Sequence, residues 1–526
     1  MYLYLSKYVL KSNMLYNSYI FLFLFLPVTL FGFHFLSKFG HYKLTLSWLV
    51  AASLFFYGWW NPIYIVLLVG SAIFNYAIGY LLLARSHKVF LYFGIIGNLA
   101  TLGYFKYANF FVDNMNFFFN NNIILEQIIL PLGISFFTFQ QITFLVDTHL
   151  GKTKEFNFLQ YCLFVTFFPQ LISGPIVHHK RMMPQFAKKT LSILKLENLA
   201  VGLTTFIIGL FKKVFLADNI AVFATPAFEA AFYGIDLTFF EAWGASLAYA
   251  FQLYFDFSGY SDMALGLGIM FGIALPFNFL SPFKSKNISE FWRCWHISLS
   301  TLIRDYLYYP ISLLLTRYAA IKKLGAIPLF ILSIFIPTMF AFFWMGLWHG
   351  AGWHFVLFGL IHGIYIVIYN IWIKIINAIP QNKRIKKNNI TDFISQIITF
   401  SAVIFSFVIF RAENIDVAKE IIFSMLGFNG IEFSDIFRIG VFGAKPKIGI
   451  FWILLSMLIV NFLPNSKEFI LSKSKTFKKQ GDIVSNSASK RITWKPNFFW
   501  GAIFVIMLTL SLLSFSNTSE FLYFQF

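Results

Sequence analysis

The chain has 526 residues, of which 58% are hydrophobic and only 12% are charged. Soluble domains carry about 25% charged residues, and a soluble core of this length has no room for 72 phenylalanines and 25 tyrosines. The net charge of +19 would suit a nucleic-acid binder, but the basic residues form short clusters between apolar segments, as in the cytoplasmic loops of membrane proteins. Composition therefore excludes a nucleic-acid partner and predicts an all-α polytopic protein of a lipid membrane.

The first apolar run, residues 19–36, lacks a small-residue cleavage site and continues into further apolar sequence. It is therefore expected to be a membrane helix and not a cleaved signal peptide. Residues 1–13 are expected to be a dispensable extension, with Met14 as an alternative start. The remainder, 14–526, is predicted to be a single integral membrane domain, with a core at about 128–415 and C-terminal helices and tail at about 448–526.

Apolar segments of about 20 residues are the expected membrane-crossing units. The sequence offers fifteen candidate segments, from which roughly 11–14 membrane segments are predicted. Residues 114–122 are rich in asparagine and are expected to form an exposed loop. The candidate segments are 19–37, 45–60, 62–83, 88–106, 128–147, 158–177, 197–216, 240–255, 262–280, 297–316, 327–346, 353–375, 393–411, 448–463 and 497–515.

Two of these segments, 128–147 and 158–177, are interrupted by proline and glycine. Broken apolar segments are tolerated at membrane depth only where they line protein or a cavity, so both are assigned to the core. The basic linkers 178–189, 376–391 and 465–492 are expected to face the cytosol.

Polar residues gather in two stretches of the otherwise apolar chain, 256–310 and 347–355. Such residues are costly in a membrane and suggest function. His349 ends an apolar segment, where desolvation favours a neutral imidazole that can accept a proton from a hydroxyl or thiol. Three neighbouring glycines remove bulk beside it: Gly346, Gly350 and Gly352. The structural alternative is a helix-packing histidine bonded to a carbonyl group.

His296 is placed on a predicted helix, with Trp292 and Ser300 four residues before and after it and therefore on the same face. Its expected role is to orient the acyl group or tune the site through hydrogen bonds. The alternative is that His296 satisfies backbone groups at a bend. His354 and His362 are predicted to lie on other faces than His349. No His-x-x-x-His pair is present, and 348–362 contains no acid, so no metal site is expected.

Asp256 and Asp262 are carboxylates within apolar sequence and need partners. The cations available in the same stretch are Arg293 and Arg304. Both acids are predicted to shape the core or line a tunnel, together with Trp292, Ser300 and Trp348. A structural ion pair that stabilises the core is at least as well supported as a catalytic role. The chain has no G-x-S-x-G elbow and no P-loop.

The ordered motifs resemble the bacterial branch of the membrane-bound O-acyltransferases (MBOAT), which includes the membrane subunits of alginate and peptidoglycan O-acetylation. The resemblance implies a helical core pierced by a tunnel, with His349 and His296 at the family's two histidine positions. One departure is Cys294, where many relatives have arginine. The motifs are LGYFKYANFF (102–111), LPLGISFFTFQ (130–140), FFPQLISGPIVHHKRMMPQF (167–186), DFSGYSDMALGLGIMFG (256–272), ISEFWRCWHISLSTLIRDYLYYP (288–310), GLWHGAGWHFVLFGLIHG (346–363) and FRAEN (410–414).

This resemblance predicts an enzyme of the bacterial inner membrane that passes an acetyl group from cytosolic acetyl-CoA to an extracytoplasmic glycan, such as an alginate-like polysaccharide or peptidoglycan. No bound cofactor is expected. Lys180, Arg181 and Arg293 are candidates to meet the phosphates of the donor. A periplasmic SGNH-type acetyltransferase is the expected partner, in addition to the glycan acceptor and membrane lipid. The alternatives are a transporter or precursor flippase of a polysaccharide export system, and a non-catalytic scaffold.

The C-terminal sequence FLYFQF, residues 521–526, ends the chain in aromatic residues. The simple interpretation is an interfacial anchor. The sharper hypothesis is that Tyr523 carries the acyl group: its phenol would take the acetyl group near His349 and pass it to the partner.

Overall fold

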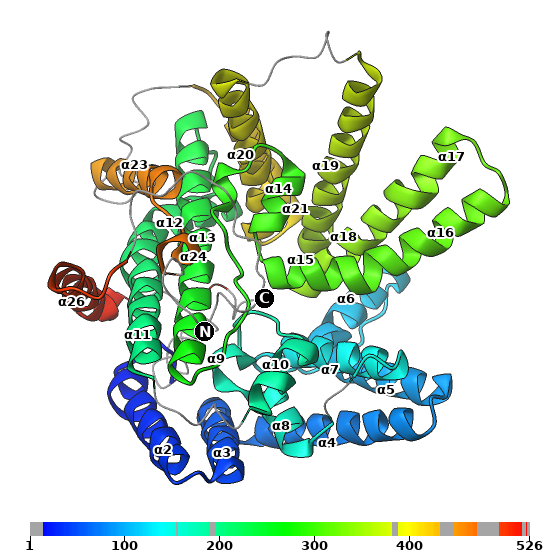
Figure 1. The fold of residues 1–526 in the computed structure, drawn as a ribbon. Helices are drawn as coiled ribbons and strands as arrows, with labels where there is room; N and C mark the ends of the chain where they lie inside the picture. Colours follow the sequence, from blue (N-terminus) through cyan, green and yellow to red (C-terminus); the bar gives the residue numbers. More distant parts are fainter. Residues whose placement is uncertain are drawn as a thin grey trace. The chain divides into compact units, whose positions relative to one another are not determined.

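The computed structural model describes residues 14–153, 156–188, 195–380, 388–431, 446–470, 494–517 and 522. Throughout these ranges the regular structure is helical and contains no strand (Figure 1), which confirms the all-α prediction. The described helices belong to two compact units. The predicted extension 1–13, the tail residue Tyr523 and much of the basic linkers lie outside the described residues.

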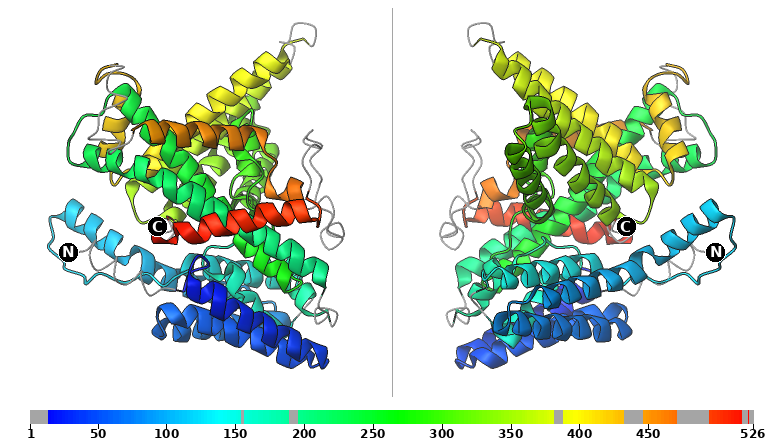
Figure 2. Two further views of the ribbon diagram at one scale, coloured as in Figure 1. Left: turned by 90° about the vertical axis from the view of Figure 1, so that its left-hand side faces the viewer. Right: turned by 90° about the vertical axis from the view of Figure 1, so that its right-hand side faces the viewer.

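The first unit is formed by the described residues within Met1–Phe215, Ser258–Phe277 and Ser466–Gln525. Neighbouring helices of its N-terminal part, such as α2 and α3, lie side by side (Figures 1 and 2). Its helices are η1 (Phe21–Phe25), α2 (Leu26–Lys38), α3 (Tyr42–Trp60), α4 (Ile63–Ala84), α5 (Lys88–Leu102), η2 (Gly103–Tyr107), α6 (Ala108–Phe119), α7 (Ile134–His149), α8 (Phe158–Thr166), α9 (Phe168–Leu171), α10 (His179–Phe186), α11 (Leu196–Leu210), α24 (Ser466–Ile470), α26 (Phe498–Leu513) and η10 (Ser514–Asn517).

The second unit is formed by Leu216–Phe257 and Asn278–Asn465. Two helices contribute residues to both units, η4 (Phe211–Ala217) and α13 (Phe239–Met270). The helices that lie within the second unit are α12 (Asp218–Phe232), η5 (Pro282–Lys284), α14 (Ile288–Cys294), α15 (Ile297–Ile303), η6 (Arg304–Tyr308), α16 (Tyr309–Ile321), α17 (Ala326–Phe330), η7 (Ile331–Phe335), α18 (Ile336–His349), α19 (Trp353–Ala378), α20 (Asn389–Arg411), α21 (Ile415–Met425) and α23 (Pro446–Phe462).

Seven helical stretches in the described ranges are long and apolar enough to cross a membrane. The predicted count of 11–14 also included shorter segments, such as those that form α23 and α26, and it remains a prediction. The seven stretches are Phe21–Lys38, Ile63–Ala84, Lys88–Phe119, Leu196–Phe232, Ala326–His349, Trp353–Ala378 and Asn389–Arg411.

The two candidate segments 240–255 and 262–280 are wrong as separate units, because α13 continues without a break from Phe239 to Met270. In the first unit, a Cβ on Gly259 would lie 2.7 Å from the carbonyl oxygen of Gly209, so the polar part of α13 packs directly against the backbone of α11. Close packing, not a loop, explains the glycine there.

The asparagine-rich region also differs from its prediction. Asn114 and Asn116 lie on α6, and the loop begins only after Phe119. The Asn114 side-chain amide donates to the carbonyl oxygen of Phe110, one turn earlier. Asparagine within a helix can satisfy its side chain in this way on a carbonyl group of the preceding turn.

The broken segment 158–177 is confirmed: α8 ends at Thr166, and the four-residue helix α9 begins at Phe168. This break is buried, and the backbone groups that lose their helix hydrogen bonds there find partners within the first unit. The Phe168 amide donates to the hydroxyl oxygen of Ser53, and the Phe168 carbonyl oxygen accepts from the hydroxyl of Tyr16 at 2.6 Å. Irregular backbone is therefore paired inside protein, as a membrane setting requires.

Candidate active site

His349 is the last residue of α18 in the second unit, and Gly350 leaves the helix in an extended conformation. The histidine side chain is buried, and aromatic rings surround it. Trp348, Phe358 and Phe410 stand edge-on to the imidazole, with ring centroids 5.0, 5.8 and 5.3 Å away. The predicted apolar setting of this histidine is therefore present.

The glycines near His349 admit a neighbouring helix. A Cβ on Gly346 would lie 2.3 Å from the carbonyl oxygen of Phe355, and a Cβ on Gly359 would lie 2.2 Å from that of Phe342. Helices α18 and α19 thus meet backbone to backbone and lie side by side (Figures 1 and 2). Small residues permit this approach between membrane helices. Of the three predicted glycines, Gly346 meets the backbone of α19, whereas a Cβ on Gly350 or Gly352 would meet the side chain of Phe355 or His354.

His296 does not lie on a continuous helix, so the prediction that it shares a helix face with Trp292 and Ser300 is wrong. It sits between α14 and α15 in the left-handed conformation, with φ 42° and ψ 54°. Asn278 holds the turn: its carbonyl oxygen accepts from the Ile297 amide, and its side-chain oxygen accepts from the amide and hydroxyl of Ser298. The residue before α15 can therefore adopt a conformation that a side chain ordinarily disfavours.

The imidazole of His296 is almost completely buried. The ring of Phe257 stands edge-on to it at 4.7 Å, and the ring of Trp348 lies at 5.9 Å. Burial lowers the pKa of His296 from 6.5 to about 3, so this imidazole is neutral at physiological pH. Trp348 contacts both His296 and His349. The structure thus brings the two predicted histidines to one tryptophan.

Trp292 and Ser300 have partners other than the imidazole of His296. The Trp292 indole donates to Nδ1 of His362 at 3.2 Å, which leaves the proton of a neutral His362 on Nε2. That nitrogen lies 2.8 Å from the hydroxyl of Ser406, which donates in turn to the carbonyl oxygen of Val403. This satisfied chain joins α14, α19 and α20. The Ser300 hydroxyl bonds the backbone carbonyl of His296 at 3.2 Å.

The two predicted acids occupy different environments. Asp256 is buried on α13 in the second unit. Asp262 belongs to the first unit, where its Oδ2 accepts from the ammonium group of Lys212 at 2.6 Å and from the hydroxyl of Ser466 at 2.5 Å. Lys212 was missed because it lies 50 residues from its partner. To predict this ion pair, one would have had to know that α11 and η4 pack against α13.

The arginines that the sequence offered as partners do not pair with these acids among the described residues. Arg304 bonds its neighbour Asp305 at 2.8 Å, on an exposed surface. Arg293 is exposed near the end of α14. The expectation of an Arg293 or Arg304 ion pair with Asp256 or Asp262 is therefore replaced by the Lys212–Asp262 pair in the first unit.

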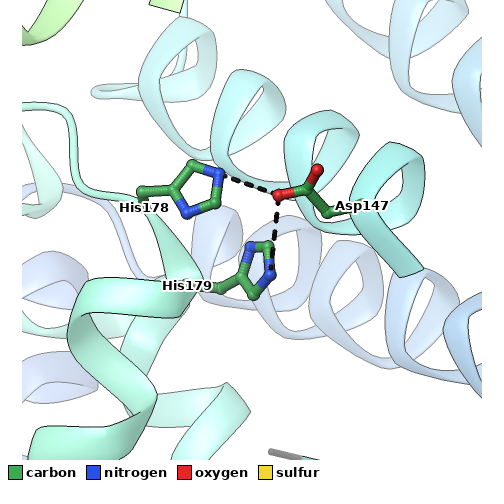
Figure 3. Close-up of side chains that lie close together, drawn as sticks. All are labelled: Asp147, His178 and His179. Atoms are coloured by element: carbon green, nitrogen blue, oxygen red, sulfur yellow. Dashed lines mark ion pairs between the residues drawn. The ribbon is translucent and has the colours of Figure 1, made fainter. Parts of the chain in front are cut away.

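Asp147, His178 and His179 form a second polar cluster in the first unit that sequence reasoning did not single out. Figure 3 shows both imidazoles turned toward one carboxylate oxygen, with Nε2 of His178 at 3.1 Å and Nε2 of His179 at 3.8 Å. The ammonium group of Lys180 reaches the same oxygen at 2.8 Å. Lys180 was assigned to donor phosphates, but the buried Asp147 already balances its charge.

The ligand types and spacing of this cluster also resemble those of a metal site. Hydrogen bonds engage the same nitrogens in this structure. Nδ1 of His178 accepts from the Lys180 amide, which places the proton on Nε2. Thr148 donates to the Phe144 carbonyl and accepts from Thr153. Thr153 is then left to accept from Nε2 of His179, 3.4 Å away. In this arrangement the Nε2 atoms of both histidines point to hydrogen-bond partners, and a metal would have to displace their protons.

Comparisons with known proteins identify the family of the chain. The sequence model of the membrane-bound O-acyltransferase family matches residues 148–410, a range that contains both His296 and His349. The peptidoglycan O-acetyltransferase of Helicobacter pylori is 41% identical over 448 residues, which are 80% of this chain and 81% of that protein. The chain belongs to the membrane-bound O-acyltransferase family.

Other relatives of this O-acyltransferase act in related systems. The probable alginate O-acetylase AlgI of Pseudomonas putida is 35% identical over 525 residues, 98% of this chain and 100% of that protein. The teichoic acid D-alanyltransferase of Streptococcus thermophilus is 30% identical over 288 residues, 53% of this chain and 68% of that protein. The protein is thus an O-acyltransferase with many membrane helices, which favours the enzyme over the transporter and scaffold alternatives.

Proposed function

We propose that this O-acyltransferase moves an acetyl group from cytosolic acetyl-CoA across the bacterial inner membrane for the O-acetylation of an extracytoplasmic glycan. The proposal rests on one observation: the imidazole rings of His349 and His296 both contact the indole ring of Trp348, in an aromatic, water-poor environment. The names of the relatives, which act on peptidoglycan and alginate, support the glycan and the acetyl group.

His349 is assigned the role of general base. Its neutral imidazole takes the proton from the acceptor hydroxyl as the oxygen attacks the thioester carbonyl carbon. The carbon–sulfur bond then breaks, the new ester bond remains, and the leaving thiolate takes the proton back from the imidazolium. The buried, neutral His296 is assigned to orient the acyl group by hydrogen bonding. Neither step requires a metal or a bound cofactor.

The position of His349 supports transfer across a membrane. Helices α19 and α20 are joined by residues 379–388, part of the basic linker that is predicted to be cytosolic, and His349 contacts their other ends through Phe358 and Phe410. The 26 residues of α19 span about 39 Å at 1.5 Å per residue. The acyl group is therefore expected to reach His349 from the cytosol through the protein.

The central test replaces His349 with alanine, and His354→Ala serves as the matched control because it removes a half-buried imidazole five residues away. Ester-linked acetate on the cell-wall glycan or exopolysaccharide is released by mild base and quantified. We expect H349A to lose more than 99% of the acetylation and H354A to keep it, at equal protein levels in the membrane. Acetylation by H349A at the wild-type level would remove the proposed base.

The proposal includes a periplasmic SGNH-type acetyltransferase as the partner that finishes the transfer. It also includes Tyr523 as the carrier, with the acetyl group on its phenol oxygen before the partner takes it. Tyr523→Phe keeps the aromatic ring and removes the hydroxyl. Loss of acetylation in Y523F supports the carrier role, and unchanged acetylation rules it out.

A further inference from the structure

His362 lies on α19 and is completely buried, and the proposed acyl transfer gives it no role. Both of its ring nitrogens have partners on other helices. Nδ1 accepts from the indole of Trp292 on α14, and Nε2 faces the hydroxyl of Ser406 on α20. An indole can only donate, so the neutral imidazole carries its proton on Nε2 and the ring has one orientation.

The two hydrogen bonds of His362 differ in what else holds the helices that they join. Within the described ranges, the bond from Trp292 is the only side-chain hydrogen bond between α14 and α19. Helices α19 and α20 are also joined by the hydroxyl of Tyr365, which donates to the carbonyl oxygen of Ala402. The attachment of α14 to α19 therefore depends more on His362 than the attachment of α20 does.

Helix α14 leads directly to His296, because the helix ends two residues earlier. The ring of Phe291 on α14 lies parallel to the imidazole of His362, with ring centres 6.2 Å apart. The same ring stacks on the indole of Trp295 at 5.5 Å, and Trp295 is the residue before His296. The attachment of α14 through Trp292 therefore positions the segment that carries His296.

His362 is also linked to His349. Phe358 lies one turn before His362 on α19, and its ring centre is 4.7 Å from that of His362 and 5.8 Å from that of His349. The ring of Phe358 also contacts Phe410 at 4.9 Å, and Phe410 lies 5.3 Å from His349. Residues of the second unit alone thus connect His362 to both histidines of the candidate site.

We propose that His362 is a positioning residue for acyl transfer. Its bond to Trp292 holds α14 against α19, and this contact sets the position of the His296 imidazole relative to His349. A displacement of about 1 Å at a reacting group can lower the rate about 100-fold. Both nitrogens of His362 are occupied by Trp292 and Ser406, so His362 acts through its neighbours and not on the substrate. This inference rests on the proposed roles of His349 and His296 and adds a third histidine that supports them.

Two substitutions each keep one of the two bonds. In His362→Asn the side-chain oxygen lies where Nδ1 lies, so it can accept from Trp292. In His362→Gln the side-chain nitrogen takes the place of Nε2, so it can donate to Ser406 but leaves the Trp292 indole without its acceptor. Ester-linked acetate on the cell-wall glycan or exopolysaccharide is measured at an expression level at which acetylation rises in proportion to the enzyme. We expect H362N to keep most of the acetylation and H362Q to lose it at least tenfold.

Trp292→Phe removes the same bond from the other side and keeps an aromatic ring. It should lower acetylation as much as H362Q does, and the double variant W292F/H362Q should lose no more than either single variant, because the two changes remove one interaction. Trp243→Phe is the matched control. It removes an indole bond of 3.0 Å to the carbonyl oxygen of Met425, between α13 and α21 in the same unit, and should acetylate like the wild type.

Unfolding temperatures in detergent are measured for every variant. H362N and H362Q each lose one buried bond, so their unfolding temperatures should fall alike while their acetylation differs. Equal losses of acetylation in these two variants would assign His362 a purely structural role, and losses that multiply in W292F/H362Q would also overturn the proposal. H349A is tested in parallel. Its loss of acetylation, beside wild-type acetylation by H362Q and W292F, would refute the positioning role alone, whereas wild-type acetylation by H349A would refute the proposed base.

Discussion

Gly346 and Gly359 face each other so closely that a Cβ on the first would lie 3.2 Å from the Cα atom of the second. No side chain separates the two helices there. His349 follows Gly346 by one turn, so the distance between α18 and α19 also determines where the imidazole lies. The position of the candidate base is therefore set by the absence of a methyl group one turn before it.

Gly346→Ala is predicted to impair both stability and acyl transfer. The new methyl group meets the carbonyl oxygen of Phe355 at 2.3 Å, and overpacking of this kind costs about 1–3 kcal/mol. We expect at least a tenfold loss of activity. Gly363→Ala is the control, because its nearest neighbour is the flexible side chain of Met339 at 3.0 Å. Thermal unfolding in detergent and acetyl transfer are measured for both; equal behaviour of the two variants would contradict the close-packing explanation.

The left-handed backbone of His296 predicts an unusual order of stability among its variants. A residue with a Cβ costs about 1–2 kcal/mol in that conformation, whereas glycine does not. His296→Gly should therefore unfold at a higher temperature than His296→Ala, although it removes more side-chain atoms. Both should lose acyl transfer if the imidazole orients the substrate. Wild-type transfer by H296G would instead assign His296 a purely structural role.

The Lys212–Asp262 pair is predicted to matter through the charge that a single substitution leaves behind. Lys212→Met strands a largely buried carboxylate, and loss of one partner of such a pair costs about 3–5 kcal/mol. Adding Asp262→Asn should recover much of that loss. Lys419→Met provides the exposed comparison, since its pair with Asp416 at 2.9 Å is open to solvent and contributes at most about 1 kcal/mol. The free energies of unfolding of the wild type, K212M, the K212M/D262N double variant and K419M are compared by chemical denaturation.

Because the imidazole of His179 is buried, we predict that the folded protein loses stability in acid. Burial is the main reason why the pKa of His179 falls from 6.5 to about 3, and the neighbouring His178 lowers it further. Below pH 6.5, His179 of the unfolded chain therefore binds a proton, whereas His179 of the folded protein stays neutral down to about pH 3. Stability should fall as the pH drops from 6.5 toward 3, by at most about 1.4 kcal/mol per pH unit.

The matched variants for this pH dependence are His179→Asn and His87→Asn, the second at an exposed histidine. Unfolding temperatures are measured between pH 7 and pH 5. The slope should become shallower in H179N and stay unchanged in H87N. An unchanged slope in H179N would mean that other groups carry the acid sensitivity.

The sequence could predict features that depend on local chemistry. The apolar runs indicated the helices, the proline and glycine breaks indicated the interruption after α8, and the glycines near His349 indicated reduced bulk beside the histidine. Features that depend on residues far apart in the sequence could not be predicted. The turn at His296 depends on Asn278, and the charge of Asp262 is balanced by Lys212, from a different helix. The continuity of α13 through residues 256–261 depends on their packing against α11, which lies far away in the sequence.

The π-helical stretches have a consequence for how this sequence tolerates change. Five of them interrupt helices in the described ranges: Phe21–Phe25, Gly103–Tyr107, Phe211–Ala217, Arg304–Tyr308 and Ile331–Phe335. A π turn holds one residue more than an α turn. Loss of a single residue there restores the ordinary winding without rotating the rest of the helix. These stretches are thus the places where homologous chains can differ in length by one residue and still present the same faces to their neighbours.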